Sequence, residues 1–92
     1  MDDILKRVTI SAQFFESGKI VPLEWHQEHR TLGLYLIEEN GNRVFRRYIC
    51  QCEDEDKGER SYATFVFFMR SLKWFVETKG ETGYGENDVD SE

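Results

Sequence analysis

Residues 31–52, TLGLYLIEENGNRVFRRYICQC, decide the fold expected of this chain. Asn40-Gly41, near the middle of the stretch, tolerates the positive φ angles of a two-residue hairpin turn. Residues 31–37 before the dipeptide and residues 43–52 after it are rich in strand-forming side chains. The stretch therefore predicts an antiparallel β-hairpin with its turn at this dipeptide.

A second hairpin is predicted toward the N-terminus. Apolar and polar residues alternate over residues 8–14, as a half-buried strand requires. Ser17-Gly18 supplies a turn, and residues 19–25 follow as another strand-forming segment. Pro22 has no N–H group to donate to a neighbouring strand. We therefore expect this segment to be an edge strand or to break at the proline.

Residues 53–60, EDEDKGER, form a charged segment after the central hairpin. Four consecutive acids repel one another and require water, so we expect a solvated hairpin tip. A loop that binds a divalent ion is the less favoured alternative. Calcium loops alternate their ligands and end in a spaced glutamate, and this segment does neither.

Residues 61–79 fit two different structures. Many of their apolar side chains fall on one stripe at helical spacing, which indicates a helix. The segment is also crowded with Tyr, Thr, Val, Phe and Trp, which favour strands, and a helix would leave Phe67 and Trp74 on its polar face. We therefore expect two strands, residues 62–68 and 73–77, with the helix kept as the alternative.

Together these segments predict an all-β fold, either a small antiparallel barrel or a strongly bent meander of about six strands. The alternative has four strands and a C-terminal helix over residues 61–79. Alternation along the strands predicts a core made of apolar side chains from the whole body. These side chains are Val8, Ile10, Ala12, Phe14, Ile20, Leu32, Leu34, Leu36, Phe65, Phe67 and Phe75.

Composition and charge limit the domain organisation. The chain has 92 residues and a net charge of −6. Residues 81–92 contain five acids and no base, so we expect residues 1–80 to form one domain and residues 81–92 a disordered acidic tail. Because the body is then nearly balanced in charge, it lacks the basic excess of an autonomous nucleic-acid-binding protein. We find no apolar run long enough for a membrane span and no secretory signal, so we expect a cytoplasmic protein.

Three segments carry a resemblance to known proteins. They are Gly18-Lys19-Ile20-Val21-Pro22-Leu23-Glu24-Trp25, Arg47-Tyr48-Ile49-Cys50 and Trp74-Phe75-Val76-Glu77. In this order they resemble a group of small, uncharacterised bacterial proteins, mostly from Firmicutes, that look like compact all-β domains. The resemblance implies the six-strand fold in a bacterial protein. It implies no activity, and no catalytic residue transfers from it.

Two cysteines and two histidines form a candidate zinc set. Cys50 and Cys52 leave the same face of one predicted strand. The predicted two-residue turn would place His29 opposite Cys52, with His26 close by. Zinc accepts such a set, although structural sites space their cysteines more widely along the chain. We therefore favour two unliganded thiols and hold a zinc-stabilised domain as the alternative.

We expect no enzymatic activity and no cofactor. The serines have no nucleophile-elbow context, and no glycine-rich loop could cradle a phosphate. A pair of Cys50 with His26 or His29 would lack a group to orient the imidazole.

One pattern indicates a binding surface. Arg46 and Arg47 stand beside Tyr48 in the second arm of the central hairpin. Adjacent strand residues face opposite sides, so one of the two arginines must face the core or an aromatic ring. Arg, Tyr and Trp are enriched at binding hot spots, and Trp25 completes the candidate patch. We expect an interaction module that binds a partner protein or a second copy of itself through this patch or an edge strand. A nucleic-acid-associated barrel is a weaker alternative.

Overall fold

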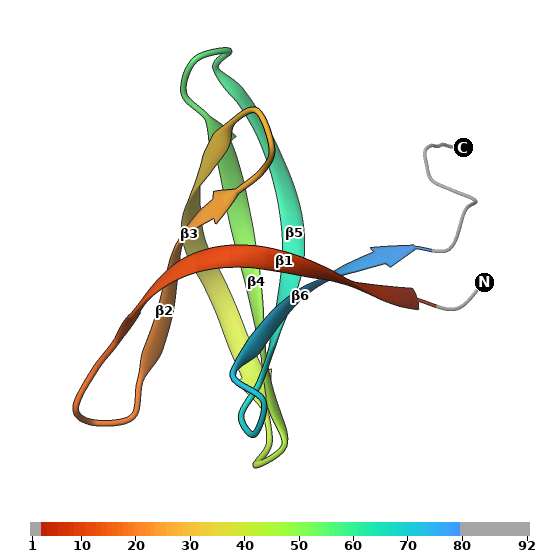
Figure 1. The fold of residues 1–92 in the computed structure, drawn as a ribbon. Coiled ribbons are helices and arrows are strands. Elements are labelled where there is room, and N and C mark those ends of the chain that lie inside the picture. Colours follow the sequence, from red (N-terminus) through yellow and green to blue (C-terminus); the bar gives the residue numbers. More distant parts are fainter. Residues whose placement is uncertain (1–2, 80–92) are drawn as a thin grey trace.

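The computed structural model describes residues 3–79, and these form six antiparallel strands (Figure 1). The strands are β1 (Asp3–Phe14), β2 (Ile20–His26), β3 (Thr31–Gly41), β4 (Phe45–Asp54), β5 (Glu59–Phe68) and β6 (Lys73–Lys79). They close into a barrel in chain order, because β1 pairs with β6 through its first half and with β2 through its second half. The all-β prediction is confirmed, and the predicted tail, residues 81–92, lies outside the described residues.

Residues 61–79 form two strands rather than a helix. β5 and β6 contain the two predicted segments, and both strands are longer than expected. Phe67 lies opposite Trp74 across the hairpin, and their ring centroids are 4.7 Å apart. The helical alternative is wrong, because these two aromatic rings pack on each other inside the barrel instead of facing solvent.

The β3–β4 hairpin is present, but its turn lies beyond Asn40-Gly41. Both residues pair within the ladder, Gly41 with Arg46. Asn42 begins the turn, and its side-chain oxygen accepts hydrogen bonds from the two N–H groups at the tip, at 2.8 and 3.1 Å. Gly41 has a φ of +136°, and a Cβ there would collide with the backbone of Phe45. Glycine is therefore required beside the turn rather than in it.

The displaced turn changes the register of the whole hairpin. Cys52 lies opposite Leu34, so the predicted pairing of Cys52 with His29 is wrong. Cys50 lies opposite Leu36, and a bulge directly after Leu36 shifts the register by one residue. Both cysteines consequently face the barrel interior, where they are buried.

Pro22 predicts an edge strand or a break at the proline; β2 is an inner strand of the closed barrel, but its pairing is irregular next to Pro22. The strand pairs with β1 from one end to the other, but with β3 only over the segment from Glu24 to His26. Pro22 lies in the half without a β3 partner, opposite Ala12 and directly before a bulge at Leu23 of β2. The missing N–H group therefore interrupts no pairing with β3, which allows a proline within the closed barrel.

Alternating side chains from the strands fill the barrel. The buried members of the predicted core are Ile20, Leu32, Leu34, Phe65 and Phe67. The partly buried members, packed against them, are Val8, Ile10, Ala12 and Leu36. The core prediction is wrong for Phe14, which is 59% exposed at the end of β1. It is also wrong for Phe75, because its neighbours Trp74 and Val76 face the interior instead.

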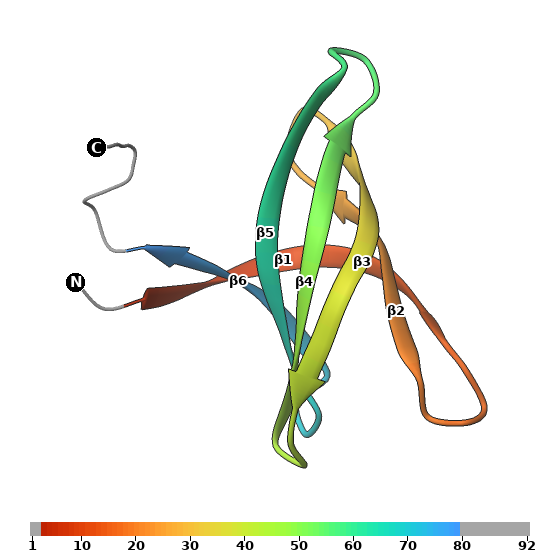
Figure 2. The same ribbon diagram turned by 180° about the vertical axis from the view of Figure 1, so that it is seen from behind.

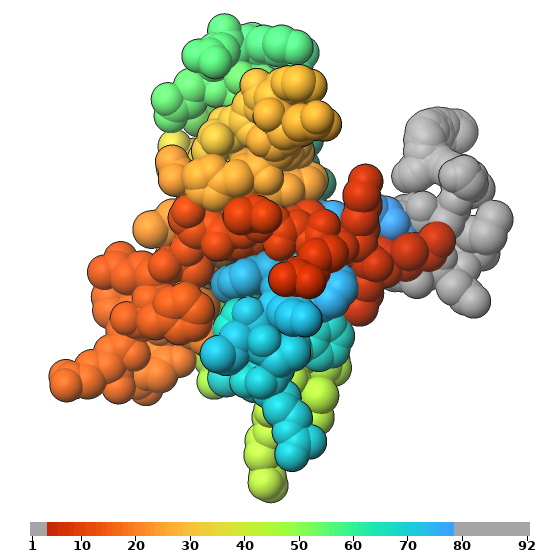
Figure 3. All heavy atoms as spheres, in the orientation of Figure 1, coloured from red at the N-terminus to blue at the C-terminus, as the bar shows by residue number. Residues whose placement is uncertain are grey.

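Strand pairing is uneven around the barrel. The β2–β3 contact contains three residue pairs and the β5–β6 contact four, whereas β4 and β5 pair over ten. Where pairing stops the strands separate, and the first half of β1 leaves the body together with the end of β6 as a two-stranded arm (Figures 1 and 2). Figure 3 shows the β1 part of this arm (red) standing off from the gold and green body.

Candidate functional site

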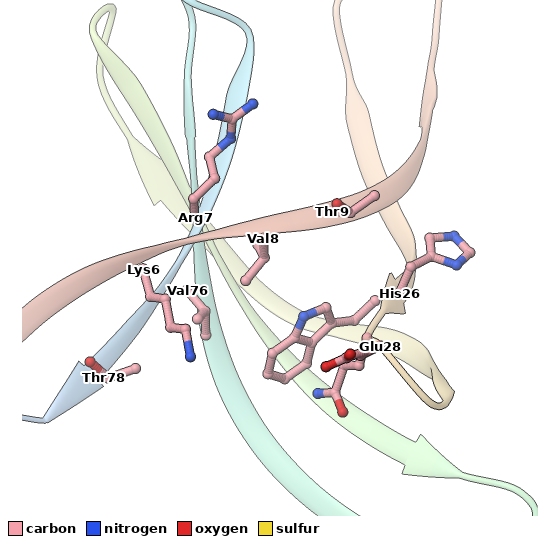
Figure 4. A pocket seen from close by; sticks show the side chains of 10 residues that line it. Lys6, Arg7, Val8, Thr9, His26, Glu28, Val76 and Thr78 are labelled. Atoms are coloured by element: carbon pink, nitrogen blue, oxygen red, sulfur yellow. The ribbon is translucent and has the colours of Figure 1, made fainter.

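A cavity of about 550 Å³ opens beside the arm, where β6 separates from β5 (Figure 4). We call it the mouth cavity, and we call this end of the barrel the mouth. Its wall includes Lys6, Val8, Trp25, Glu28, Val76 and Thr78. Because β1, β2, β6 and the β2–β3 loop all contribute, the cavity depends on the closed barrel.

The alternation of side chains along β1 and β6 places aliphatic residues in the wall of the mouth cavity. Lys6 and Val8 leave one face of β1, whereas Arg7 leaves the other and points away from the cavity (Figure 4). Lys6 lies opposite Val76 on β6, so the two strands present their side chains together. Val8 and Val76 thus form an apolar wall with the Lys6 ammonium group at its edge.

Trp25 supplies the aromatic surface of the mouth cavity. Its side chain is half-buried at the end of β2, and its ring packs edge-on against buried Phe65, with centroids 5.1 Å apart. The next residue, His26, lies with Nε2 2.6 Å from Ser11 Oγ and with Nδ1 3.3 Å from Thr31 Oγ1. These contacts fix the end of β2 and, with it, the position of Trp25.

The contact of Ser11 with His26 has the distance of a nucleophile–base pair, but it lacks the rest of such a site. The carboxylate of Glu24 lies 3.7 Å from Nε2, the same nitrogen that meets the serine. The other ring nitrogen faces the hydroxyl of Thr31. A catalytic histidine needs an orienting partner on the nitrogen remote from the nucleophile, usually a carboxylate. We therefore assign this contact to the structure of the barrel.

Two opposite charges stand at the rim of the mouth cavity. Figure 4 shows Lys6 and Glu28 on opposite sides of the opening, with Val8 and Val76 between them. The site thus combines a cation, an anion and the apolar wall formed by Val8 and Val76. Such an arrangement can hold an apolar group and orient it through polar contacts at the edge.

The predicted patch of Trp25, Arg46, Arg47 and Tyr48 does not form one surface. Trp25 lies at the mouth, whereas Tyr48 is fully buried inside the barrel. Burial, together with the nearby charge of Glu39, raises the pKa of the Tyr48 hydroxyl. Arg46 leaves the same face of β4 as Tyr48, near the β3–β4 turn, and its Nη1 lies 3.8 Å from the Glu39 carboxylate.

Arg47 lies on the outer face of β4, where it forms a two-pronged ion pair. Its Nε and Nη2 donate to the two carboxylate oxygens of Glu77 on β6, at 2.8 and 3.0 Å. Arg47 also lies opposite Val66 of β5, a residue that is only 3% exposed. The ion pair therefore bridges β4 and β6 over the outer side of β5, and we assign Arg47 to the stability of the sheet.

The candidate zinc ligands are not brought together. Cys50 and Cys52 are buried inside the barrel, whereas the His29 side chain is 89% exposed in the β2–β3 loop. Burial, with a smaller contribution from Cys52, raises the pKa of the Cys50 thiol to about 12, and burial also raises the pKa of Cys52. Within residues 3–79, no three His, Cys, Asp or Glu side chains are grouped so that they could hold a metal ion.

Only residues 55–58 of the acidic segment 53–60 form the expected hairpin tip, because β4 extends to Asp54 and β5 begins at Glu59. Asp54 is 5% exposed, and its Oδ2 accepts a hydrogen bond from Arg30 Nη1 at 3.0 Å. Its Oδ1 accepts the backbone N–H groups of Asp56 and Lys57. Desolvation acts to raise the pKa of the Asp54 carboxyl, but these hydrogen bonds and the Arg30 charge outweigh it and hold the pKa below its ordinary value.

Sequence reasoning found Trp25 but missed most of the mouth cavity. Lys6 extends the alternation of residues 8–14 by one step toward the N-terminus, so its side could have been inferred. No local signal marks Glu28, because it lies in a loop whose position depends on the fold. Val76 was missed because Phe75 was assigned to the interior.

Comparison of the chain with known protein families, curated proteins and solved structures yields no match. The described residues form strands and turns only, so none of their elements is a helix long and apolar enough to cross a membrane.

Proposed function

We propose that the chain is a non-enzymatic protein-interaction module of the bacterial cytoplasm, and that its partner inserts an apolar side chain into the mouth cavity against Trp25. The observation that carries this proposal is the cavity of about 550 Å³ at the end of the barrel. Barrel mouths are frequent ligand sites, and tryptophan is enriched among the residues that dominate binding energy. Two unbridged, buried thiols fit a reducing compartment.

The charges at the mouth favour a protein over a nucleic acid. Lys6 is balanced by Glu28 across the cavity, so the rim presents no continuous basic surface. Arg46 and Arg47, which could have contacted phosphates, instead lie near the carboxylates of Glu39 and Glu77. Nucleic-acid binding depends on several phosphate contacts by unpaired cations. A rim with one cation and one anion instead suits the polar border of a protein interface.

Affinity capture from a lysate of the source organism, with and without nuclease treatment, tests the proposal. The immobilised full chain is compared with Trp25→Ala and Lys6→Glu. Tyr35→Ala and Lys19→Glu serve as matched controls, because both residues are exposed and lie outside the cavity wall. We expect one stoichiometric partner, retained by the controls and reduced at least about tenfold by Trp25→Ala.

Three results would contradict the proposal. They are a partner captured equally by all five proteins, a capture that nuclease abolishes, and the absence of any stoichiometric partner. Denaturant unfolding of each variant separates a lost contact from a lost fold, because Trp25→Ala must remain folded for its result to count.

A further inference from the structure

One side of β5 has no neighbouring strand at the mouth. β6 pairs with β5 only from Phe65 to Phe68, and the last of these pairs at the mouth joins Phe65 to Val76. Beyond Val76, β6 pairs with β1 alone. Among the described residues, no strand therefore pairs with this edge of β5 over residues 59–64 (Figures 1 and 2). The backbone hydrogen-bonding groups of that edge have no strand partner.

Residues 61–64 of this edge lack the charges that usually protect an unpaired strand. Residues 61–64 are Ser, Tyr, Ala and Thr, and the preceding Arg60 is held by Glu53, with Nε 3.0 Å from Oε2. Tyr62 is 69% exposed. The part of β3 beyond Gly33, which β2 also leaves unpaired, is uncharged over residues 34–37 and carries Glu38 and Glu39 after them, but no β3 residue lines the mouth cavity. Proteins place charges on edges to prevent pairing with other chains; on the β5 edge the charges are confined to Glu59 and Arg60 at one end, and residues 61–64 carry none.

The unpaired edge and the mouth cavity lie at the same place. Val76 pairs with Phe65 at the point where the edge begins, and Val76 also lines the cavity. Trp25 packs on Phe65 and forms the aromatic part of the wall. A strand laid along residues 59–64 would continue the sheet from which β6 departs. Alternate side chains of that strand would point inward, toward the cavity.

We propose that the partner binds as an added strand along residues 59–64 of β5 and places one apolar side chain in the mouth cavity. This inference rests on the proposed function and names the form of the partner. The partner segment is extended and contains no proline at the paired positions, because each added backbone hydrogen bond needs its N–H group. An acidic side chain on one flank meets Lys6, and a basic side chain on the other meets Glu28.

A peptide selection tests the inference. Short random peptides are selected against the immobilised full chain, and the enriched peptide is synthesised in an unmodified form and in two forms that are N-methylated at alternate amides. N-methylation of the amides that face β5 removes about two hydrogen bonds and should weaken binding about tenfold. Methylation of the other set should change the affinity much less. NMR titration of the full chain locates the peptide through the backbone amides of residues 59–64.

Matched variants of the protein complete the test. Tyr62→Lys places a protective charge on the β5 edge and should weaken binding, whereas Tyr35→Lys on β3 should not. Strand addition would be overturned by peptides that shift the NMR signal of the Trp25 indole but not the backbone amides of residues 59–64, and whose affinity does not change on N-methylation. The mouth cavity would then remain the binding site. If no enriched peptide perturbs either region, both this inference and the proposed function are overturned.

Discussion

The two ends of the barrel use aromatic side chains in opposite ways. At the end that holds the β3–β4 and β5–β6 turns, Trp74 lies between Tyr48 and Phe67, with ring centroids 5.5 and 4.7 Å apart. All three rings are buried. At the mouth, Trp25 packs on Phe65 but borders an open cavity. We call the first end the filled end.

The two ends differ in the pairing of β5 with β6. At the filled end, β3 and β5 remain paired with their hairpin partners up to the turns, and Tyr48, Phe67 and Trp74 are buried between them. At the mouth, β6 leaves β5 after Val76 and takes its pairing to β1. A ring that is enclosed contributes to stability through its full burial. A ring beside a gap keeps surface that a partner can cover.

The largest expected effect is on stability at the filled end. Trp74→Ala should lower the free energy of unfolding by about 3–5 kcal/mol, because it leaves a cavity among buried rings. Trp25→Ala should cost less than about 2 kcal/mol, because that ring is half-buried beside an existing cavity. Urea unfolding measures both losses.

A domain of this size has a small free energy of unfolding, so Trp74→Ala could prevent folding. In that case the milder substitutions Trp74→Phe and Trp25→Phe are compared instead. The substitution at residue 74 should still be the more damaging of the two. Equal losses at the two positions would contradict the distinction between an enclosed and an open end.

The next effect compares a glycine at each end. Gly41 at the filled end and Gly58 in the β4–β5 turn both have a positive φ, +136° and +67°. A Cβ at Gly41 would collide with the backbone of Phe45, whereas one at Gly58 meets nothing within 4 Å. Gly41→Ala should therefore cost about 3 kcal/mol, and Gly58→Ala about 1 kcal/mol, from the φ angle alone. Similar losses in urea unfolding would show that the β3–β4 backbone can relax.

The β3–β4 turn shows how far local sequence can predict this fold. Alternation and residue type correctly predicted the strands, because each strand buries one face. The turn position was wrong, since both Asn40-Gly41 and Asn42 carry turn signals and local propensity does not decide between them. The observed register instead follows from burying Cys50 and Cys52 opposite leucines of β3, which is a contact between distant residues.

The mouth cavity could not have been predicted by the same reasoning. Its wall depends on where β6 leaves β5 and on the position of the β2–β3 loop. No periodic pattern in the sequence marks either of these features. The error at Phe75 has the same origin, because a shift of one residue exchanges the inner and outer faces of a strand. Trp25 was identified only because its residue type is common at interfaces.

The third prediction concerns the pH dependence of stability that arises at the β4–β5 turn, near the mouth. The pKa of Asp54 is lowered in the folded protein, chiefly by Arg30 against the opposing effect of desolvation. Its contribution to stability is therefore complete above the unfolded carboxyl pKa of about 4 and is lost as the pH falls through the lower folded value. Asp54→Asn should be less stable than wild type at neutral pH, and the two should converge in acid. Urea unfolding across this pH range tests this.

Glu55→Gln is the matched control, because Glu55 is exposed in the same turn and is not the partner of Arg30, so it should not reproduce the loss of stability of Asp54→Asn at neutral pH. A constant gap between wild type and Asp54→Asn down to strong acid would contradict the assignment of the carboxylate.

The smallest expected effect is a gain in stability, and it compares one turn from each end. In the β4–β5 turn, Gly58 donates its N–H to the Asp54 carbonyl at 2.7 Å, and in the β5–β6 turn Leu72 donates to the Phe68 carbonyl at 2.8 Å. Leu72 has a φ of +59° and is 67% exposed, so the filled end holds a left-handed leucine where the other turn has glycine. Leu72→Gly should raise the free energy of unfolding by about 0.5–1 kcal/mol, because relief of left-handed strain exceeds the added entropy of the unfolded chain. Leu72→Ala, which keeps the Cβ, should give no such gain in urea unfolding. If Leu72→Gly instead lowers the free energy of unfolding, then contacts of the leucine side chain stabilise the protein by more than the left-handed conformation costs. The two turns would then differ in side-chain packing as well as in backbone conformation.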